Sequence, residues 1–481
     1  MQSQFSNFYT PKRFKGRTGL QIFVDRFYRE GPPPEPIQGR ILKDWSDTTP
    51  NWEPDSEGEY QNNYFYGGNL RGIISKLDYI KNNGFNLIYL SPMGLSETSH
   101  HYEPTDQLKI DPWIGTWEDF QNLCHEAHSR NILVAVDLVF NHVGIQNPIF
   151  KEALENPESE YRDWFEWENN LPVFWAGFKN MPQCNKLNAG YQEYACKVST
   201  HYIEMGADAI RLDLGELFPK EFMMKLRKTV KAVNPEVLIV SEMWGLDNKR
   251  QIPQLDGQQV DSVMNYPLAD AIARWVRYGN DSHFTYNVGE ILKYPKEAQA
   301  VLWNFIDSHD TPRAMNLLVG EGMLEDPYKG AIWDIEAPWR HEGWFDTYGF
   351  RKWELEQDHI DTKKASGRLL IASTIQYFMP GIPIVFAGTE IGMTGYKDPF
   401  NRKPYNWEQP NEAVLNHYQT LGALRKNYHE FFSQAGEVKV KVSYSHIRIT
   451  RKNSFGEMIL DMVRNCDEKK SSWKLMVNVK N

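Results

Sequence analysis

Charged and polar side chains stand at the ends of four apolar segments of this chain, where packing alone favours none. In chain order they are Asp137 with Asn141 and His142, Arg211 with Asp213, Glu242, and His309 with Asp310. An ionised carboxylate at the edge of an apolar core is costly unless it is paired or used in chemistry. A single such residue is usually a structural ion pair, whereas four segments that end this way favour a catalytic centre.

Three carboxyl groups of this set suit the cleavage of a glycosidic bond. Arg211 and Asp213 lie two positions apart on one strand, so they project on the same side, and the guanidinium is expected to lower the pKa of Asp213, as suits a nucleophile. Glu242 follows 29 positions later, and its apolar sequence neighbours are expected to raise its pKa, as a general acid requires. Neighbouring strand ends place two carboxyls about 5–5.5 Å apart, the spacing of retaining glycosidases. Asp310 can then bind sugar hydroxyls and stabilise an oxocarbenium-like transition state.

Eight short apolar segments supply the elements that position these residues. They begin at Gly19, Phe85, Ile132, Ala207, Val237, Asp261, Val301 and Ile382. They are too continuous for half-solvated strands and too short for ordinary helices, so they indicate strands buried on both faces of a parallel sheet. Helix-like stretches lie between several of them, at 70–83, 117–130, 191–204 and 221–233. This alternation predicts an α/β protein built on a (β/α)8 TIM barrel, whose site lies at the carboxyl ends of the strands.

Two connections are too long for simple strand–helix links. The first predicts a small inserted domain after the third strand, at 144–182, so the barrel comprises 1–143 and 183–432. The second, at about 320–364, carries four tryptophans: Trp333, Trp339, Trp344 and Trp353. Both are expected to wall a cleft. Alternating polar and apolar residues after the last helix, predicted at 412–432, indicate a C-terminal antiparallel β domain at 433–481.

Composition excludes several classes of protein. The chain has 481 residues, 41% hydrophobic and 24% charged, as in soluble globular proteins, and its net charge of −10 argues against nucleic acid as a partner. Four scattered cysteines without a CxxC motif favour neither a disulfide framework nor a zinc site. No apolar run reaches the roughly 20 residues that cross a membrane, and no secretory signal is visible, so a cytoplasmic protein is expected. The aromatic content of 14% suits a sugar-binding cleft as well as a large core.

Four ordered segments resemble the signature regions of the α-amylase family of glycoside hydrolases. They are DLVFNH at 137–142, AIRLD at 209–213, SEMWG at 241–245 and FIDSHDTPR at 305–313. The resemblance extends over nearly the whole chain, including DPFNRKPYNW at 398–407. HDTPR and MPQCN (181–185) are similar to the neopullulanase and maltodextrin-hydrolase branch. The N-terminal module common in that branch is not expected here.

The resemblance implies a role for each site residue. Asp213 matches the nucleophile, Glu242 the acid/base and Asp310 the transition-state stabiliser. The residues that match the sugar-binding positions are Tyr102, His142, Arg211 and His309, with Tyr102 stacked under the sugar. Asp137 matches a residue that supports the site. Asn141 matches a calcium ligand of many members, but MPQCN lacks the acidic residue such sites often use, so no metal or other cofactor is expected to be required and calcium stays open.

The predicted function is a retaining hydrolase of α-glucosidic, mainly α-1,4, bonds in maltooligosaccharides or related α-glucans. A 4-α-glucanotransferase and an exo-acting α-glucosidase are alternatives on the same site. A metal-dependent barrel hydrolase with Asp137, His142, His309 and Asp310 as ligands is disfavoured, because Arg211 repels a cation. A non-catalytic amylase-like scaffold is disfavoured because all three acidic positions are filled. Linkage preference, substrate length and oligomeric state stay open.

Overall fold

Eight parallel strands surround the centre of the protein, in the spatial order β12–β11–β10–β7–β4–β1–β14–β13. In chain order they are β1 (Gly19–Ile22), β4 (Leu87–Leu90), β7 (Leu133–Leu138), β10 (Ala209–Leu212), β11 (Leu238–Ser241), β12 (Ser262–Val263), β13 (Trp303–Asn304) and β14 (Ile382–Phe386). A parallel bridge between Met264 and Trp303 joins the two edges. The predicted barrel and its eight strands are confirmed, because each strand is buried along its whole length.

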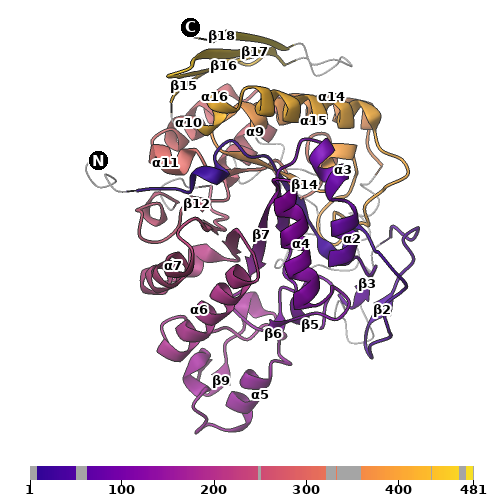
Figure 1. Cartoon of the computed structure of the whole chain (residues 1–481), viewed down its shortest axis with the longest axis vertical. Helices are drawn as coiled ribbons and strands as arrows, with labels where there is room; N and C mark the ends of the chain where they lie inside the picture. The colour runs from indigo at the N-terminus through magenta and orange to yellow at the C-terminus, as the bar shows by residue number, and fades with distance from the viewer. Residues whose placement is uncertain are drawn as a thin grey trace.

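The computed structural model describes residues 8–49, 62–246, 251–320, 332, 359–434, 436–464 and 473–479 (Figure 1). The four tryptophans of the predicted second insertion, Trp333, Trp339, Trp344 and Trp353, lie outside the described residues. None of the described helices combines the length and the apolar composition needed to span a membrane.

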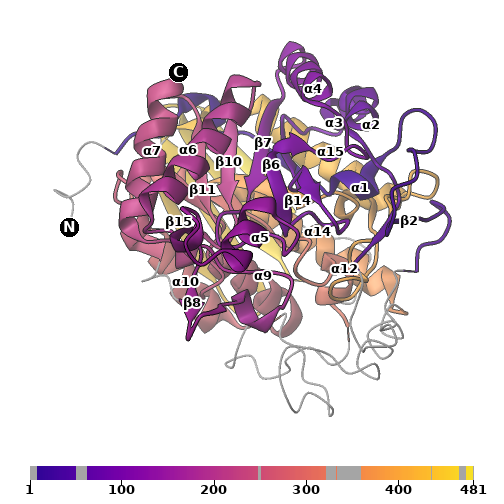
Figure 2. The same cartoon turned by 90° about the horizontal axis from the view of Figure 1, so that it is seen from below.

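Helices pack around the strands and follow the sequence expectation closely. In chain order they are α1 (Val24–Phe27), α2 (Leu70–Ser75), α3 (Leu77–Asn82), α4 (Trp117–Ser129), α6 (Ala189–Glu204), α7 (Lys220–Val233), α9 (Tyr266–Tyr278), α10 (Asp281–Ile291), α11 (Lys296–Gln299), α12 (Ala314–Leu317), α14 (Thr362–Phe378), α15 (Glu412–Asn427) and α16 (His429–Ser433). In Figure 2, α6 and α7 flank one side of the strands, and α2, α3 and α4 another.

Apart from single-residue differences at the ends of α4 and α7, the predicted helix limits differ from the structure in three places. The predicted helix at 70–83 is interrupted at Lys76, which has φ −106° and ψ 2°. The one at 412–432 is interrupted at Tyr428, with φ −118° and ψ 36°. The helix predicted from 191 begins two residues earlier, because the side chain of Asn188 accepts a hydrogen bond from the Tyr191 amide and caps it there.

Two smaller units lie at opposite ends of the molecule (Figure 1). The inserted segment after β7 contains α5 (Pro148–Glu155) and the hairpin β8 (Trp167–Glu168) and β9 (Leu171–Pro172). The C-terminal unit is an antiparallel sheet of β15 (Glu437–Val442), β16 (His446–Asn453), β17 (Gly456–Val463) and β18 (Trp473–Val479). The predicted inserted and C-terminal units are therefore present, while their boundaries in sequence stay predictions.

Two further strand pairs lie in the loops around the barrel. They are β2 (Ile41–Leu42) with β3 (Tyr64–Phe65), which are parallel, and β5 (Gly94–Ser96) with β6 (Pro104–Ile110), which are antiparallel. The loop between β5 and β6 carries Tyr102.

Candidate active site

Neighbouring strands bring three acidic side chains to one end of the barrel. In the register of the sheet, Asp137 on β7 lies beside Arg211 on β10, and Leu212 lies beside Ser241 on β11. Asp213 and Glu242 each follow the last paired residue of their strand. Both residues therefore lie at the carboxyl ends of neighbouring strands, at the same height along the barrel axis. Barrel enzymes place their catalytic groups at this end.

The guanidinium of Arg211 holds all three carboxyl groups. This side chain is fully buried. Its Nη1 donates to Asp137 Oδ1 at 2.8 Å and to Asp213 Oδ1 at 2.9 Å. Its Nη2 lies 2.5 Å from Glu242 Oε1. The carboxyls of Asp213 and Glu242 therefore contact opposite nitrogens of the same guanidinium.

Glu242 is buried among hydrogen-bond donors. Its Oε1 accepts from Trp244 Nε1 at 3.0 Å and from the Tyr266 hydroxyl at 3.3 Å, and its Oε2 accepts from the Leu214 amide at 2.8 Å. Burial raises the pKa of Glu242 above its ordinary value, and the charge of Asp310 adds to this while Arg211 opposes it. The direction is the one expected of a general acid.

The pKa of Asp213 departs from the expectation. We expected Arg211 to keep it low, and this is wrong for the net shift. Burial raises the pKa of Asp213 well above its ordinary value, and the charges of Glu242, Asp137 and Asp310 raise it further, against the opposing effect of Arg211. The single guanidinium of Arg211 does not offset both the burial of Asp213 and the charges of the neighbouring carboxylates, so the net shift of this pKa is upward.

Asp310 lies beside His309 and Arg402. Its Oδ2 lies 3.0 Å from His309 Nε2, and its Oδ1 accepts from Arg402 Nη2 at 3.2 Å. Burial alone raises the pKa of Asp310, but His309 and Arg402 outweigh it and lower that pKa below its ordinary value. The Gln21 amide lies 2.7 Å from His309 Nδ1 and donates to it, so Nε2 carries the proton that faces Asp310.

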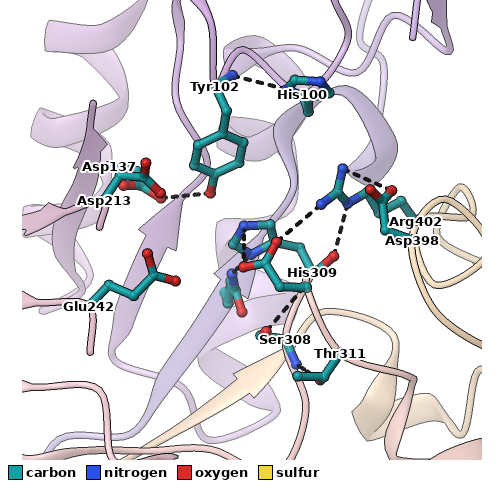
Figure 3. A network of polar contacts seen from close by, with 12 residues as sticks. His100, Tyr102, Asp137, Asp213, Glu242, Ser308, His309, Thr311, Asp398 and Arg402 are labelled. Atoms are coloured by element: carbon teal, nitrogen blue, oxygen red, sulfur yellow. Dashed lines mark hydrogen bonds and ion pairs between the residues drawn. The ribbon is translucent and has the colours of Figure 1, made fainter. Parts of the chain in front are cut away.

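Tyr102 lies between the pair Asp213 and Glu242 on one side and His309 and Arg402 on the other (Figure 3). Its hydroxyl donates to Asp137 Oδ2 at 2.8 Å, and its ring is parallel to that of His309, with centroids 5.1 Å apart. His142 Nε2 lies 2.8 Å from the backbone carbonyl oxygen of Tyr102. Burial lowers the pKa of His142 to about 4, so its imidazole is neutral at pH 7 and donates to that carbonyl. All seven predicted site residues thus come together.

A family model described as the alpha amylase catalytic domain matches residues 10–330.

The chain belongs to the α-amylase family.

Two curated relatives of this family member are similar over most of its length. It is 32% identical to a cyclomaltodextrinase of Geobacillus thermopakistaniensis (strain MAS1) over 436 residues, which cover 88% of this chain and 64% of the relative. It is 30% identical to neopullulanase 2 of Thermoactinomyces vulgaris over 434 residues, which cover 87% of this chain and 64% of the relative. The chain therefore spans less than two thirds of the length of these relatives. The predicted resemblance to this branch is confirmed.

A solved structure supports the same assignment. The type III pullulan hydrolase from Thermococcus kodakarensis superimposes with a TM-score of 0.75 at 28% sequence identity, over 95% of this chain and 77% of the other.

The surroundings of Asn141 do not fit a calcium ion. The side-chain oxygen of Asn141 accepts a hydrogen bond at 3.1 Å from the ammonium of Lys186, which also donates to the Cys184 carbonyl at 2.9 Å. Lys186 is buried, with 5% of its surface exposed. A cation of the protein itself occupies the coordination space of Asn141 and repels a metal. Within the described part of the chain, no group of three or more His, Cys, Asp or Glu side chains is arranged to hold a metal ion.

Four residues of the site were not predicted from the sequence. They are Gln21, Tyr89, Tyr266 and Arg402, of which Tyr89 donates to Asp137 Oδ2 at 2.6 Å. Gln21 carried a usable signal, because it is a polar residue within the buried strand GLQI. Arg402 lies in the DPFNRKPYNW segment that already supported the resemblance. The two tyrosines look like ordinary core residues in the sequence.

Proposed function

We propose that this protein is a retaining glycoside hydrolase of α-glucosidic, mainly α-1,4, bonds in maltooligosaccharides or related α-glucans. The observation that carries the proposal is the sharing of one buried guanidinium, that of Arg211, by Asp213 and Glu242 on adjacent strands. A single guanidinium that contacts both carboxyls keeps them close together, as the shorter carboxyl separation of retaining enzymes requires. The names of the relatives, cyclomaltodextrinase and neopullulanase, support an α-glucan as the substrate.

In the first step Glu242 and Asp213 act on the two sides of one bond. Glu242 donates its proton to the glycosidic oxygen, and the bond from that oxygen to C1 breaks. Asp213 forms a new bond to C1, which gives a covalent glycosyl-enzyme. The raised pKa of Glu242 favours the protonated form that this step requires. Asp310, which stays ionised, hydrogen-bonds the sugar hydroxyls as positive charge develops at the ring.

In the second step Glu242 acts as the base. It removes a proton from water as the water oxygen attacks C1, and Asp213 leaves as a carboxylate. A sugar hydroxyl in place of water gives a 4-α-glucanotransferase with the same residues. His142, His309 and Tyr102 are proposed to hold the sugar in this position, because the Tyr102 ring is parallel to that of His309 and the Tyr102 carbonyl contacts His142. A cytoplasmic location remains a prediction.

Product analysis tests this function. The protein is incubated separately with maltotriose, maltoheptaose, pullulan and isomaltose. The products are followed with time by chromatography, and their anomeric configuration by proton NMR of the anomeric proton. We expect α-anomers as first products from maltoheptaose, and products longer than seven units only if transfer competes. Asp213→Asn should lose at least a thousandfold in kcat. First products with the β configuration, or an Asp213→Asn variant that retains full activity, refute the proposal.

A further inference from the structure

The residue after the proposed nucleophile has an unusual backbone conformation. Leu214 has φ 50° and ψ 33°, in the left-handed region, although it carries a branched side chain. Residues with a Cβ atom seldom adopt this region, because Cβ then crowds the backbone carbonyl. Such strain persists only where the surrounding structure enforces it, and it is often found at functional sites.

The left-handed turn brings two backbone amides onto Glu242. The amide of Leu214 donates to Glu242 Oε2 at 2.8 Å, and the amide of Glu216 donates to the Glu242 backbone carbonyl at 3.1 Å. Gly215 packs so closely on β11 that an added Cβ would lie 2.2 Å from Ser241 Oγ. The turn that follows Asp213 therefore holds both the backbone and the side chain of Glu242.

The two oxygens of Glu242 are not equivalent. Oε1 faces Arg211 Nη2 at 2.5 Å, besides the hydrogen bonds from Trp244 and Tyr266. Oε2 accepts one hydrogen bond from the described residues, that of the Leu214 amide. The two hydrogen-bond donors occupy both lone pairs of Oε1, which also faces the charge of Arg211, whereas one donor leaves a lone pair on Oε2.

We propose that Leu214 is a positioning residue, whose left-handed amide fixes Glu242 so that the catalytic proton is carried and transferred by Oε2. This inference rests on the proposed function and deepens it. The amide stabilises the ionised carboxylate, so its removal is expected to raise the pKa at which Glu242 loses its proton. The other groups that face Glu242 from neighbouring elements are Arg211, Asp213, Asp137, Asp310, Tyr89 and Tyr266.

Replacement of single amides by esters isolates this hydrogen bond. Leucic acid at position 214 changes the N–H to an oxygen and keeps the leucine side chain. Leucic acid at position 217 is the matched control, because the Leu217 amide donates within the same turn, to the Leu214 carbonyl at 2.9 Å, and not to Glu242. The pH dependence of kcat/KM on maltoheptaose is measured for both esters and for the unmodified protein.

The ester at 214 is expected to move the alkaline limb of the pH profile up by about one pH unit and to lower kcat about tenfold. The ester at 217 should leave the alkaline limb in place. Coincident alkaline limbs for the two esters overturn the inference. If the unmodified protein does not turn over α-glucans, the proposed function itself is wrong, and this separate result does not depend on Leu214.

Side-chain variants cover the case in which the 214 ester does not fold. Leu214→Asn keeps a residue that tolerates the left-handed region, whereas Leu214→Val introduces a β-branched residue that resists it. We expect Leu214→Val to shift the alkaline limb in the direction predicted for the ester, and Leu214→Asn to retain the limb of the unmodified protein. Equal limbs for the two variants also overturn the inference.

Discussion

Replacement of the buried Lys186 by methionine tests whether its ammonium joins the chain just after the inserted segment to Asn141, just before that segment. The substitution keeps the length of the side chain and removes the donor from Asn141 Oδ1 and the Cys184 carbonyl. A hydrogen bond to a charged group contributes about 1.5–3 kcal/mol, and relief of the buried charge offsets part of the loss. We therefore expect the free energy of unfolding to fall by about 2–4 kcal/mol.

The assay is urea unfolding followed by tryptophan fluorescence and by activity, with and without a chelator. Lys109→Met is the matched control, because Lys109 pairs with Asp106 on the surface with 72% of its side chain exposed. The unfolding midpoint should fall for Lys186→Met and stay unchanged for Lys109→Met. The chelator should not affect the unmodified protein. A Lys186→Met protein of full stability, or an unmodified protein that the chelator destabilises, refutes the reasoning.

Two further predictions concern the support and the titration of the site. Tyr89→Phe removes one hydrogen-bond donor to Asp137 and leaves those of Tyr102 and Arg211. Urea unfolding should show that the free energy of unfolding falls by about 1–2 kcal/mol, while kcat changes less than tenfold. Unchanged stability would show that this hydrogen bond does not contribute to the free energy of unfolding. Burial raises the pKa of Glu242, the proposed acid, so kcat/KM should fall as pH rises through a pKa above the 4.5 of free glutamate. A pH profile that falls already at or below this value contradicts the assignment.

The sequence predicted the barrel because burial on both faces leaves a local signal. Each of the eight strands is a short apolar run, and this pattern depends on neighbouring residues alone. The polar residues at the strand ends could be recognised in the sequence because they too depend on the local pattern of neighbouring residues. Asp213 and Glu242 stand out because an apolar run stops abruptly at each of them.

The remaining features depend on contacts between distant parts of the chain. The net pKa of Asp213 is set by its burial and by carboxyls from distant parts of the chain, whereas the sequence shows only the nearby Arg211. The burial of Lys186 follows from the return of the inserted segment past β7, where Gln183 bridges to His142. The left-handed Leu214 carries no sequence signal, because leucine disfavours that conformation and tertiary packing imposes it.

Mass spectrometry of a trapped intermediate tests the central claim, that Asp213 attacks the sugar while Glu242 supplies the proton. A 5-fluoro-α-glucosyl fluoride forms the glycosyl-enzyme quickly and releases it slowly, so the labelled residue can be identified in a proteolytic digest. The account predicts one glycosyl group per chain, bound to the carboxyl of Asp213. A label on Glu242 or Asp310, or the absence of any covalent label while the fluoride is turned over, contradicts it.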